Sequence, residues 1–230
     1  MAGARRVEEL TPRSAEFYLR APVFFLSYAR PKRSKIREII LPDATERFAI
    51  LYRDLTSNVV DLVASRTGLD PGFMDTELEG GFRWRKELLT NLGTCQVFVP
   101  LLTTSYVRTS PWCAMEWDLY TRRKARTADG KPIDQPPILP VFWAPVPPPL
   151  PTEIAEVQRF VAPGLPDRIR ELYRAEGIVG LYRIDRGAYD AVVWSLAREI
   201  SRLYHSYVVE PLHLGDTRGL RRQFGMDEMI

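Results

Sequence analysis

The chain has 230 residues, of which 45% are hydrophobic and 27% are charged. This mixture is typical of one folded domain and excludes an intrinsically disordered protein. The net charge of +3 argues against nucleic acid as the main partner, because phosphate backbones are bound by concentrated basic surfaces. Cys95 and Cys113 each sit beside apolar residues, so we expect two buried, reduced thiols and no metal site.

The N-terminal sequence, MAGARRVEEL, contains no apolar run after its arginines and predicts no signal peptide. No stretch approaches the roughly 20 consecutive apolar residues that a transmembrane helix requires. We therefore expect a cytoplasmic protein without a membrane partner.

Short apolar runs alternate with amphipathic segments in the first part of the chain. Residues 22–28, PVFFLSY, have the length and composition of a buried parallel strand. Apolar residues over 48–63 recur at helical spacing, which indicates a helix with one face to pack. Residues 73–74 indicate a very short second strand, and a glycine-containing loop follows over 76–81.

The central part continues the alternation of helix and strand. We predict a short helix over 84–92 and a strand over 96–102, QVFVPLL. Pro100 lacks a backbone N–H, so we expect the strand to fray there. Ser110 and Pro111 have the residue types of an N-cap and a first helical position, and they predict the start of the next helix.

The C-terminal part is expected to contain further elements of both kinds. We predict a loop over 127–137, strands over 138–143 and 178–184, and helices over 152–161, 166–176 and 189–207. Residues 208–230 show little periodicity, and we expect them to be loosely attached.

Strands that alternate with helices along a whole chain are typical of a parallel sheet wrapped on both faces. We therefore predict an α/β fold with a flavodoxin-like, doubly wound sheet of about five parallel strands. Ligands of such folds bind beyond the carboxyl ends of the strands. The loops after Tyr28, Asp75, Leu102 and Trp143 are thus the candidates for a binding site.

Three segments, in order and with matching spacing, resemble the Toll/interleukin-1 receptor (TIR) domain family. They are FFLSYAR at 24–30, GFMDTELEGGFRW at 72–84 and VFVPLLTTSYVRTSPWCAMEW at 97–117. They resemble the family's first strand, its second strand with the following loop, and its third strand with a Trp-Cys-x-x-Glu helix. The resemblance implies an N-terminal extension (1–19), a TIR domain (20–207) and a C-terminal tail (208–230), and it is closest to actinobacterial TIR-like proteins.

The segment PWCAMEW resembles the enzymatic branch of the family, which cleaves the nicotinamide–ribose bond of NAD+. The resemblance implies an NAD+ hydrolase, with or without a cyclase side reaction, in bacterial antiviral defence or signal transduction. NAD+ would be the substrate, with no cofactor and no metal. Glu116 takes the position of the family's catalytic residue. Members of the family usually self-associate, so further copies or other TIR domains are the implied partners.

One carboxylate can suffice for this chemistry. Cleavage leaves positive charge on the ribose, and nicotinamide departs as a neutral molecule that needs no proton, so the second carboxyl of ordinary glycosidases is not required. Glu116 could bind the ribose hydroxyls and stabilise an oxocarbenium-like transition state. The alternative interpretation is a surface glutamate that the dipole favours in the first turns of a helix.

Two elements supply candidates for binding NAD+. Trp112 lies four residues before Glu116 on one helix, so both point the same way, and the indole either packs on the ligand or fills the core. Tyr28 and Arg30 follow the first strand at the ligand edge of the sheet. Arg30 could make a bidentate contact with the pyrophosphate.

Further candidates lie in loops at the same edge. Asp75 and Glu79 flank the glycine-containing loop, where Asp75 either contacts the ligand or caps a turn. Ser105 follows the third strand. Two basic clusters, at 30–37 and 122–126, are either solvated surface or an attraction for an anionic ligand.

A non-catalytic TIR–TIR interaction and assembly module is the alternative function. Such a module would not need Glu116. An enzyme should bring Glu116, Trp112, Arg30 and the glycine-containing loop together around one cleft about the size of a dinucleotide.

Overall fold

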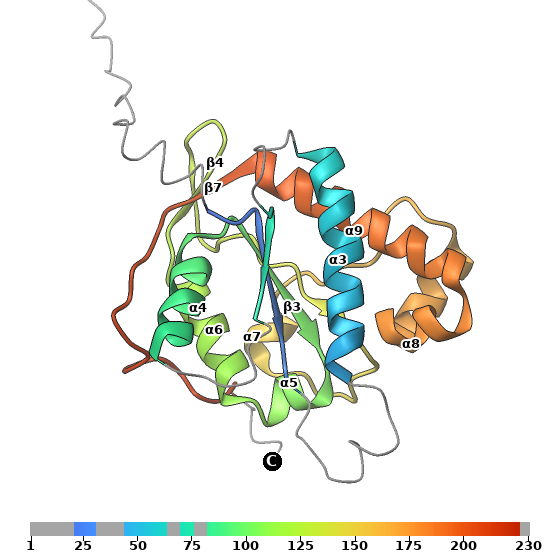
Figure 1. Cartoon of the computed structure of the whole chain (residues 1–230), viewed down its shortest axis with the longest axis horizontal. Helices are drawn as coiled ribbons and strands as arrows, with labels where there is room; N and C mark the ends of the chain where they lie inside the picture. Colours follow the sequence, from blue (N-terminus) through green and yellow to red (C-terminus); the bar gives the residue numbers. More distant parts are fainter. Residues whose placement is uncertain (1–20, 31–43, 64–69, 76–81, 226–230) are drawn as a thin grey trace, which may run out of the picture.

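A parallel sheet of four strands lies at the centre of the molecule, in the order β2-β1-β3-β6 (Figure 1). Its strands are β1 (Phe24–Tyr28), β2 (Gly72–Met74), β3 (Val97–Leu102) and β6 (Val141–Phe142). This computed structural model describes residues 21–30, 44–63, 70–75 and 82–225. The predicted α/β class is confirmed, and the strand order is compatible with a flavodoxin-like fold.

Helices cover both faces of the sheet (Figure 1). One face packs against α3 (Ala44–Leu62), α8 (Asp167–Ile184) and α9 (Arg186–Ser206), and the other against α4 (Phe82–Thr94), α5 (Thr104–Arg108), α6 (Pro111–Thr121) and α7 (Thr152–Ala155). The predicted stripe of α3 is confirmed, because Phe48, Leu51, Leu55 and Val59 are all buried. No helix in the described part of the chain combines the length and apolar character needed to cross a membrane.

Strands β1 and β3 pair over five residues, from Phe24 with Val97 to Tyr28 with Leu101. Every residue of both strands is buried. Because both faces of the sheet are covered, each strand is a continuous apolar run rather than an alternating one.

Pro100 does not fray β3, so that prediction is wrong. Phe98 exchanges backbone hydrogen bonds with Pro137 and Leu139 in the segment that leads into β6, and the carbonyl of Leu102 accepts from Trp143 just after β6. Pro100 alternates with Phe98 and Leu102 along the strand, so its nitrogen faces the same side. On that side, pairing is reduced to a bridge between Phe98 and Ile138 and to the two residues of β6. Pairing with β1 continues through Leu101. The missing donor therefore shortens the neighbouring strand rather than β3.

The predicted fifth strand over 178–184 is wrong, because these residues form the second half of α8. The first half confirms the helix predicted over 166–176. A short apolar run suits either a buried strand or a buried helix. Ile178 and Leu181 are both buried and three residues apart, so they share one face of a helix.

A kink in α8 brings its second half against the edge of the sheet. Gly177 has φ 66°, a left-handed conformation that glycine adopts without strain. Just after it, Val179 donates a backbone hydrogen bond of 3.0 Å to the carbonyl of Trp143. A helical turn therefore stands beside β6, where a fifth strand would otherwise pair.

A second, antiparallel sheet was not predicted. It has the order β5-β4-β7 and consists of β4 (Ala125–Thr127), β5 (Pro132–Ile133) and β7 (Tyr207–Val209). The predicted loop over 127–137 therefore holds a hairpin, in which Gly130 turns the chain with φ 90°. The predicted helix over 152–161 is wrong beyond Ala155, where α7 ends.

The segment after β7 is packed against the protein rather than loosely attached. It runs along the outside of α4 and α6 (Figure 1). Leu220 and Phe224 are buried in the same hydrophobic cluster as these helices. The ring of Phe224 stacks on Tyr106 and meets Trp117 edge-on, with centroid distances of 6.0 and 5.8 Å. The described part of this segment is therefore anchored to the core by Leu220 and Phe224.

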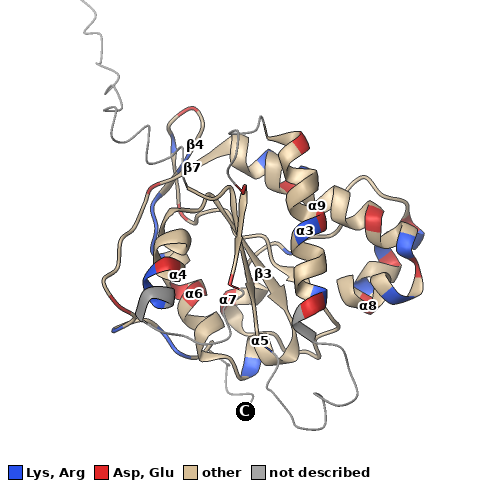
Figure 2. Ribbon diagram, viewed as in Figure 1, with Lys and Arg blue, Asp and Glu red and all other residues tan. Residues whose placement is uncertain are grey.

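Charged residues of both signs lie close together on α3, α8 and α9 (Figure 2). In the predicted basic cluster at 122–126, Arg122 pairs with Asp118 at 2.6 Å. Arg123 is only 4% exposed, so neither interpretation of this cluster, solvated surface or anion attraction, holds for it. In the other cluster, only Arg30 falls within the described residues.

Both cysteines are buried and unpaired, which confirms the expectation of two reduced thiols. Burial raises the pKa of the Cys95 thiol to about 12. Since the thiolate is the reactive form, we expect Cys95 to be inert at neutral pH.

Candidate active site

One cavity of about 450 Å³ is lined by six of the seven residues predicted for the site. These six are Tyr28, Arg30, Asp75, Ser105, Trp112 and Glu116. The seventh, Glu79, lies outside the described residues, as does the whole glycine-containing loop over 76–81. The cavity lies at the carboxyl ends of β1 and β2, the edge at which parallel α/β sheets bind ligands.

Helix α6 begins where the sequence predicted. The Ser110 side chain accepts a hydrogen bond of 3.3 Å from the backbone N–H of Cys113, and Pro111 is the first helical residue. From this start, Trp112 and Glu116 reach the cavity from adjacent turns of one helix face. Trp112 is half-buried and also packs against the hydrophobic cluster, so it serves the core as well as the cavity wall.

Glu116 is buried, with 7% of its surface exposed. The alternative interpretation of a solvated surface glutamate is therefore excluded. Ser27, at the next-to-last position of β1, donates a hydrogen bond of 2.5 Å to Oε2 of Glu116. The Ser27 hydroxyl also lies 3.0 Å from the hydroxyl of Tyr106. A carboxyl removed from water is thus held by a short chain of hydroxyl groups.

Burial raises the pKa of Glu116 to about 8, because removal from water disfavours the charged form. The hydrogen bond from Ser27 lowers this pKa, Asp75 raises it and Arg30 lowers it. The neutral carboxylic acid therefore predominates at neutral pH. A positive charge entering the cavity would shift it to the carboxylate.

Arg30 and Asp75 face each other across the ends of β1 and β2. Their side chains form an ion pair, so the carboxylate of Asp75 holds the guanidinium at the cavity wall. The hydroxyl of Tyr28 donates a hydrogen bond of 2.7 Å to the backbone carbonyl of Asp75. These two contacts fix the chain at the exit of β2.

Sequence reasoning missed three residues of this region. Ser27 and Tyr106 are fully buried, and a hydroxyl inside the apolar run FFLSY was a signal, because a buried hydroxyl needs a partner. Arg85 is an exposed residue of α4 that lines the cavity. Nothing in its local sequence distinguishes it from other exposed arginines.

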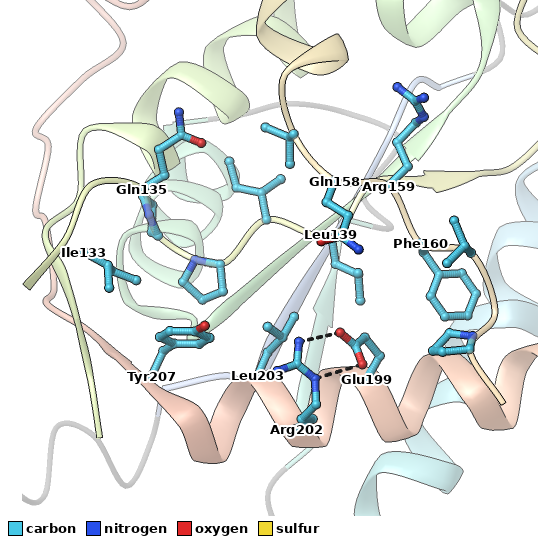
Figure 3. A pocket seen from close by; sticks show the side chains of 16 residues that line it. Ile133, Gln135, Leu139, Gln158, Arg159, Phe160, Glu199, Arg202, Leu203 and Tyr207 are labelled. Atoms are coloured by element: carbon cyan, nitrogen blue, oxygen red, sulfur yellow. Dashed lines mark hydrogen bonds and ion pairs between the residues drawn. The ribbon is translucent and has the colours of Figure 1, made fainter. Parts of the chain in front are cut away.

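A second cavity, of about 480 Å³, lies between α9 and the segment that precedes β6 (Figure 3). It is lined mainly by apolar side chains and proline. Glu199 and Arg202 bind each other there, with distances of 2.6 and 3.0 Å (Figure 3). Arg159 is the remaining charged residue of its described lining, and none of the six predicted site residues that the structure describes reaches it. The first cavity is therefore the better candidate for chemistry.

Comparison of the chain with family models, with curated proteins and with solved structures gives no match. The site is therefore interpreted from its own geometry. That geometry combines a buried carboxyl, a pair of hydroxyls and an arginine–carboxylate pair around a cavity within the size range of ligand sites.

Proposed function

We propose that this chain is an NAD+ hydrolase of the TIR family that cleaves the nicotinamide–ribose bond. The observation that carries the proposal is the buried carboxyl of Glu116, which lines one cavity together with the Arg30–Asp75 pair and the indole of Trp112. The three TIR-like segments support it from the sequence. The protein would act in the cytoplasm of a bacterium, in antiviral defence or signalling, and would release ADP-ribose or a cyclic isomer.

The reaction requires little from the protein besides stabilisation of the developing positive charge. The bond between ribose C1′ and the nicotinamide nitrogen breaks, and both electrons stay with the nitrogen, so the leaving group needs no proton. The positive charge that develops on C1′ and the ring oxygen is stabilised by the carboxylate of Glu116. Water then adds to C1′ and loses a proton.

The raised pKa of Glu116 suits this role once the charge of the substrate is included. The nicotinamide ring of NAD+ carries a positive charge, and a positive charge nearby lowers the pKa of a carboxyl. Binding would thus generate the carboxylate inside the cavity. Little water competes there with its attraction for the developing cation, so the attraction is stronger than it would be in solvent.

The remaining residues of the lining fit the other parts of the substrate. Arg30 and Arg85 supply positive charge for the pyrophosphate. Trp112 offers an indole face to the ribose or the base. As in the family that the chain resembles, we expect self-association, or association with other TIR domains, to assemble the complete site.

The test is NAD+ consumption by the purified protein at high concentration, with nicotinamide and ADP-ribose resolved. We expect Glu116→Gln to lose at least about 100-fold in turnover, because an amide cannot stabilise a cation as a carboxylate does. Glu87→Gln is the matched control, since Glu87 is exposed on α4 and lies outside the cavity lining. Absence of turnover by the parent protein, even when it is forced to cluster, would favour the assembly module.

A further inference from the structure

We propose that Ser27 and Tyr106 are positioning residues, which form a directed hydrogen-bond relay that orients the carboxylate of Glu116 within the cavity. The inference rests on the proposed role of Glu116 and adds to it the part of the protein that controls this carboxyl. The relay joins three elements, since Ser27 belongs to β1, Tyr106 to α5 and Glu116 to α6.

The three groups are shielded from water, and the Ser27 hydroxyl lies within hydrogen-bonding distance of the other two. Ser27 is 1% exposed and Tyr106 is 0% exposed. The Ser27 hydroxyl lies 2.5 Å from Oε2 of Glu116 and 3.0 Å from the Tyr106 hydroxyl. A buried hydroxyl without a partner is costly, so each member depends on the next.

The direction of the relay follows from counting protons. In the carboxylate form, which the proposed reaction uses, Glu116 can only accept hydrogen bonds, so Ser27 must donate its single proton to Oε2 of Glu116. Having no second proton, Ser27 can meet Tyr106 only as an acceptor, and Tyr106 must donate. The relay therefore favours the carboxylate form of Glu116. It also occupies Oε2, which leaves Oε1 as the oxygen for a ribose hydroxyl.

Tyr106 is held firmly enough to act as the fixed end of this relay. Its backbone N–H donates a hydrogen bond of 3.0 Å to the side chain of Thr103, the N-cap of α5. On the other side, the ring of Phe224 stacks on it. The C-terminal segment therefore packs against Tyr106, the end of the relay farthest from Glu116.

The charged and titratable groups around Glu116 shift its pKa in opposite directions. Asp75 at the end of β2 disfavours the carboxylate, and Arg30 after β1 favours it. Cys113 on α6 and Tyr106 on α5 are neutral, because burial raises the pKa of both. Ser27 makes the hydrogen bond that stabilises the charged form.

The primary test is the titration of the Glu116 carboxyl, followed by carbon-13 NMR of glutamate-labelled protein and assigned with Glu116→Gln. This measurement does not depend on catalysis. We expect Ser27→Ala to raise the apparent pKa by about one unit or more, and Tyr106→Phe to raise it by less, because the latter removes only the second hydrogen bond. Ser27→Thr, which keeps the hydroxyl, should restore the parent titration.

Matched controls remove buried hydroxyls elsewhere. Ser195 donates to the carbonyl of Pro163 at 3.0 Å, and Tyr120 donates to the carbonyl of Gln96 at 2.8 Å. Ser195→Ala and Tyr120→Phe should leave the Glu116 titration unchanged. A shift in these controls as large as that in Ser27→Ala would mean general softening of the core and would overturn the proposal.

NAD+ turnover is the second readout. We expect Ser27→Ala to lower kcat about 10- to 100-fold with KM within about threefold, and to move the acidic limb of the pH profile to higher pH. An unchanged Glu116 titration in Ser27→Ala would overturn the relay. If the parent protein turns over NAD+, an unchanged kcat in Ser27→Ala would overturn it as well. If Ser27→Ala raises the pKa of Glu116 but the parent protein shows no NAD+ turnover, the relay is supported and the proposed hydrolase activity is refuted.

Discussion

The guanidinium of Arg123 donates a hydrogen bond of 2.6 Å to the backbone carbonyl of Cys95, directly after the end of α4. The same group reaches the carbonyl of Leu92 in the last turn of α4 at 3.0 Å, and that of Glu210 after β7 at 3.0 Å. Carbonyls at a helix C-terminus lack partners within the helix and attract cations. One buried arginine therefore joins α4 to the C-terminal segment.

We expect Arg123→Met to lower the free energy of unfolding by about 2–4 kcal/mol, because it leaves several buried carbonyls without a donor. Urea unfolding followed by circular dichroism measures the change. Lys124→Met, at the exposed neighbouring position, should stay within about 0.5 kcal/mol of the parent protein. Equal losses in the two variants would refute the role of Arg123 as a link.

The pKa of Glu116 makes the stability of the protein depend on pH. The folded-state pKa of about 8 lies above that of an unfolded glutamate, so the folded protein binds more protons between about pH 4.5 and 8. The unfolding free energy should therefore fall as the pH rises through this window, by up to about 1.4 kcal/mol per pH unit. Glu116→Gln should flatten this part of the profile, measured by urea unfolding at pH 5, 6, 7 and 8. A profile unchanged by the substitution would show that Glu116 titrates normally.

Phe224→Ala should destabilise the protein by about 2–4 kcal/mol, because it removes a buried ring from between two aromatic side chains. Thermal unfolding measures the loss, and the near-ultraviolet circular dichroism of Tyr106 and Trp117 should change with it. The exposed neighbour supplies the control, since Gln223→Ala should have no measurable effect. A silent Phe224→Ala would mean that the segment is attached only loosely in solution.

Arg85→Ala should raise the KM for NAD+ about 3- to 10-fold with little change in kcat, if Arg85 attracts the pyrophosphate without touching the reacting atoms. The effect should shrink in high salt, because exposed charges are screened. Lys86→Ala removes the neighbouring exposed charge, which does not line the cavity, and should leave KM unchanged. A similar rise in KM for both variants would point to general attraction by α4.

Gly177→Ala should destabilise the fold by about 1–3 kcal/mol. The glycine has φ 66°, and an added Cβ would lie 2.7 Å from the carbonyl oxygen of Trp143. Gly187→Ala is the comparison, because its Cβ would meet no atom closer than 3.5 Å and alanine favours a helix. Differential scanning calorimetry of the two variants separates the outcomes, and equal melting temperatures would contradict the role of the kink.

The sequence predicted the fold best where a local pattern had one physical meaning. The start of α6 is an example, since Ser110 and Pro111 suit an N-cap and a first helical residue and little else. The run at 178–184 has two meanings, because a short apolar segment packs equally well as a strand or as a helix. Only its contacts with β6 and the turn at Gly177 decide between strand and helix, and neither follows from the local pattern of apolar residues.

The residues of the candidate site were likewise predictable from the sequence only in part. Tyr28, Asp75 and Glu116 could be named because they lie in segments that resemble one family. Ser27 and Tyr106 lie in the same segments, but the hydrogen bonds of Ser27 with Glu116 and with Tyr106 join residues that are 89 and 79 positions apart and exist only in the folded chain. The C-terminal segment was misjudged for a related reason: Leu220 and Phe224 are too few to form a periodic pattern, although both are buried.

The turn of α8 beside β6 also affects how the sheet can meet other proteins. An unpaired strand edge is a template for strand addition and for amyloid-like growth. At this edge, the carbonyl of Trp143 accepts from Val179, and the N–H of Phe142 donates to the hydroxyl of Tyr173 at 3.0 Å. Backbone groups that an incoming strand would need are thus already occupied. A protein that binds on this side must recognise side chains of α8 rather than extend the sheet.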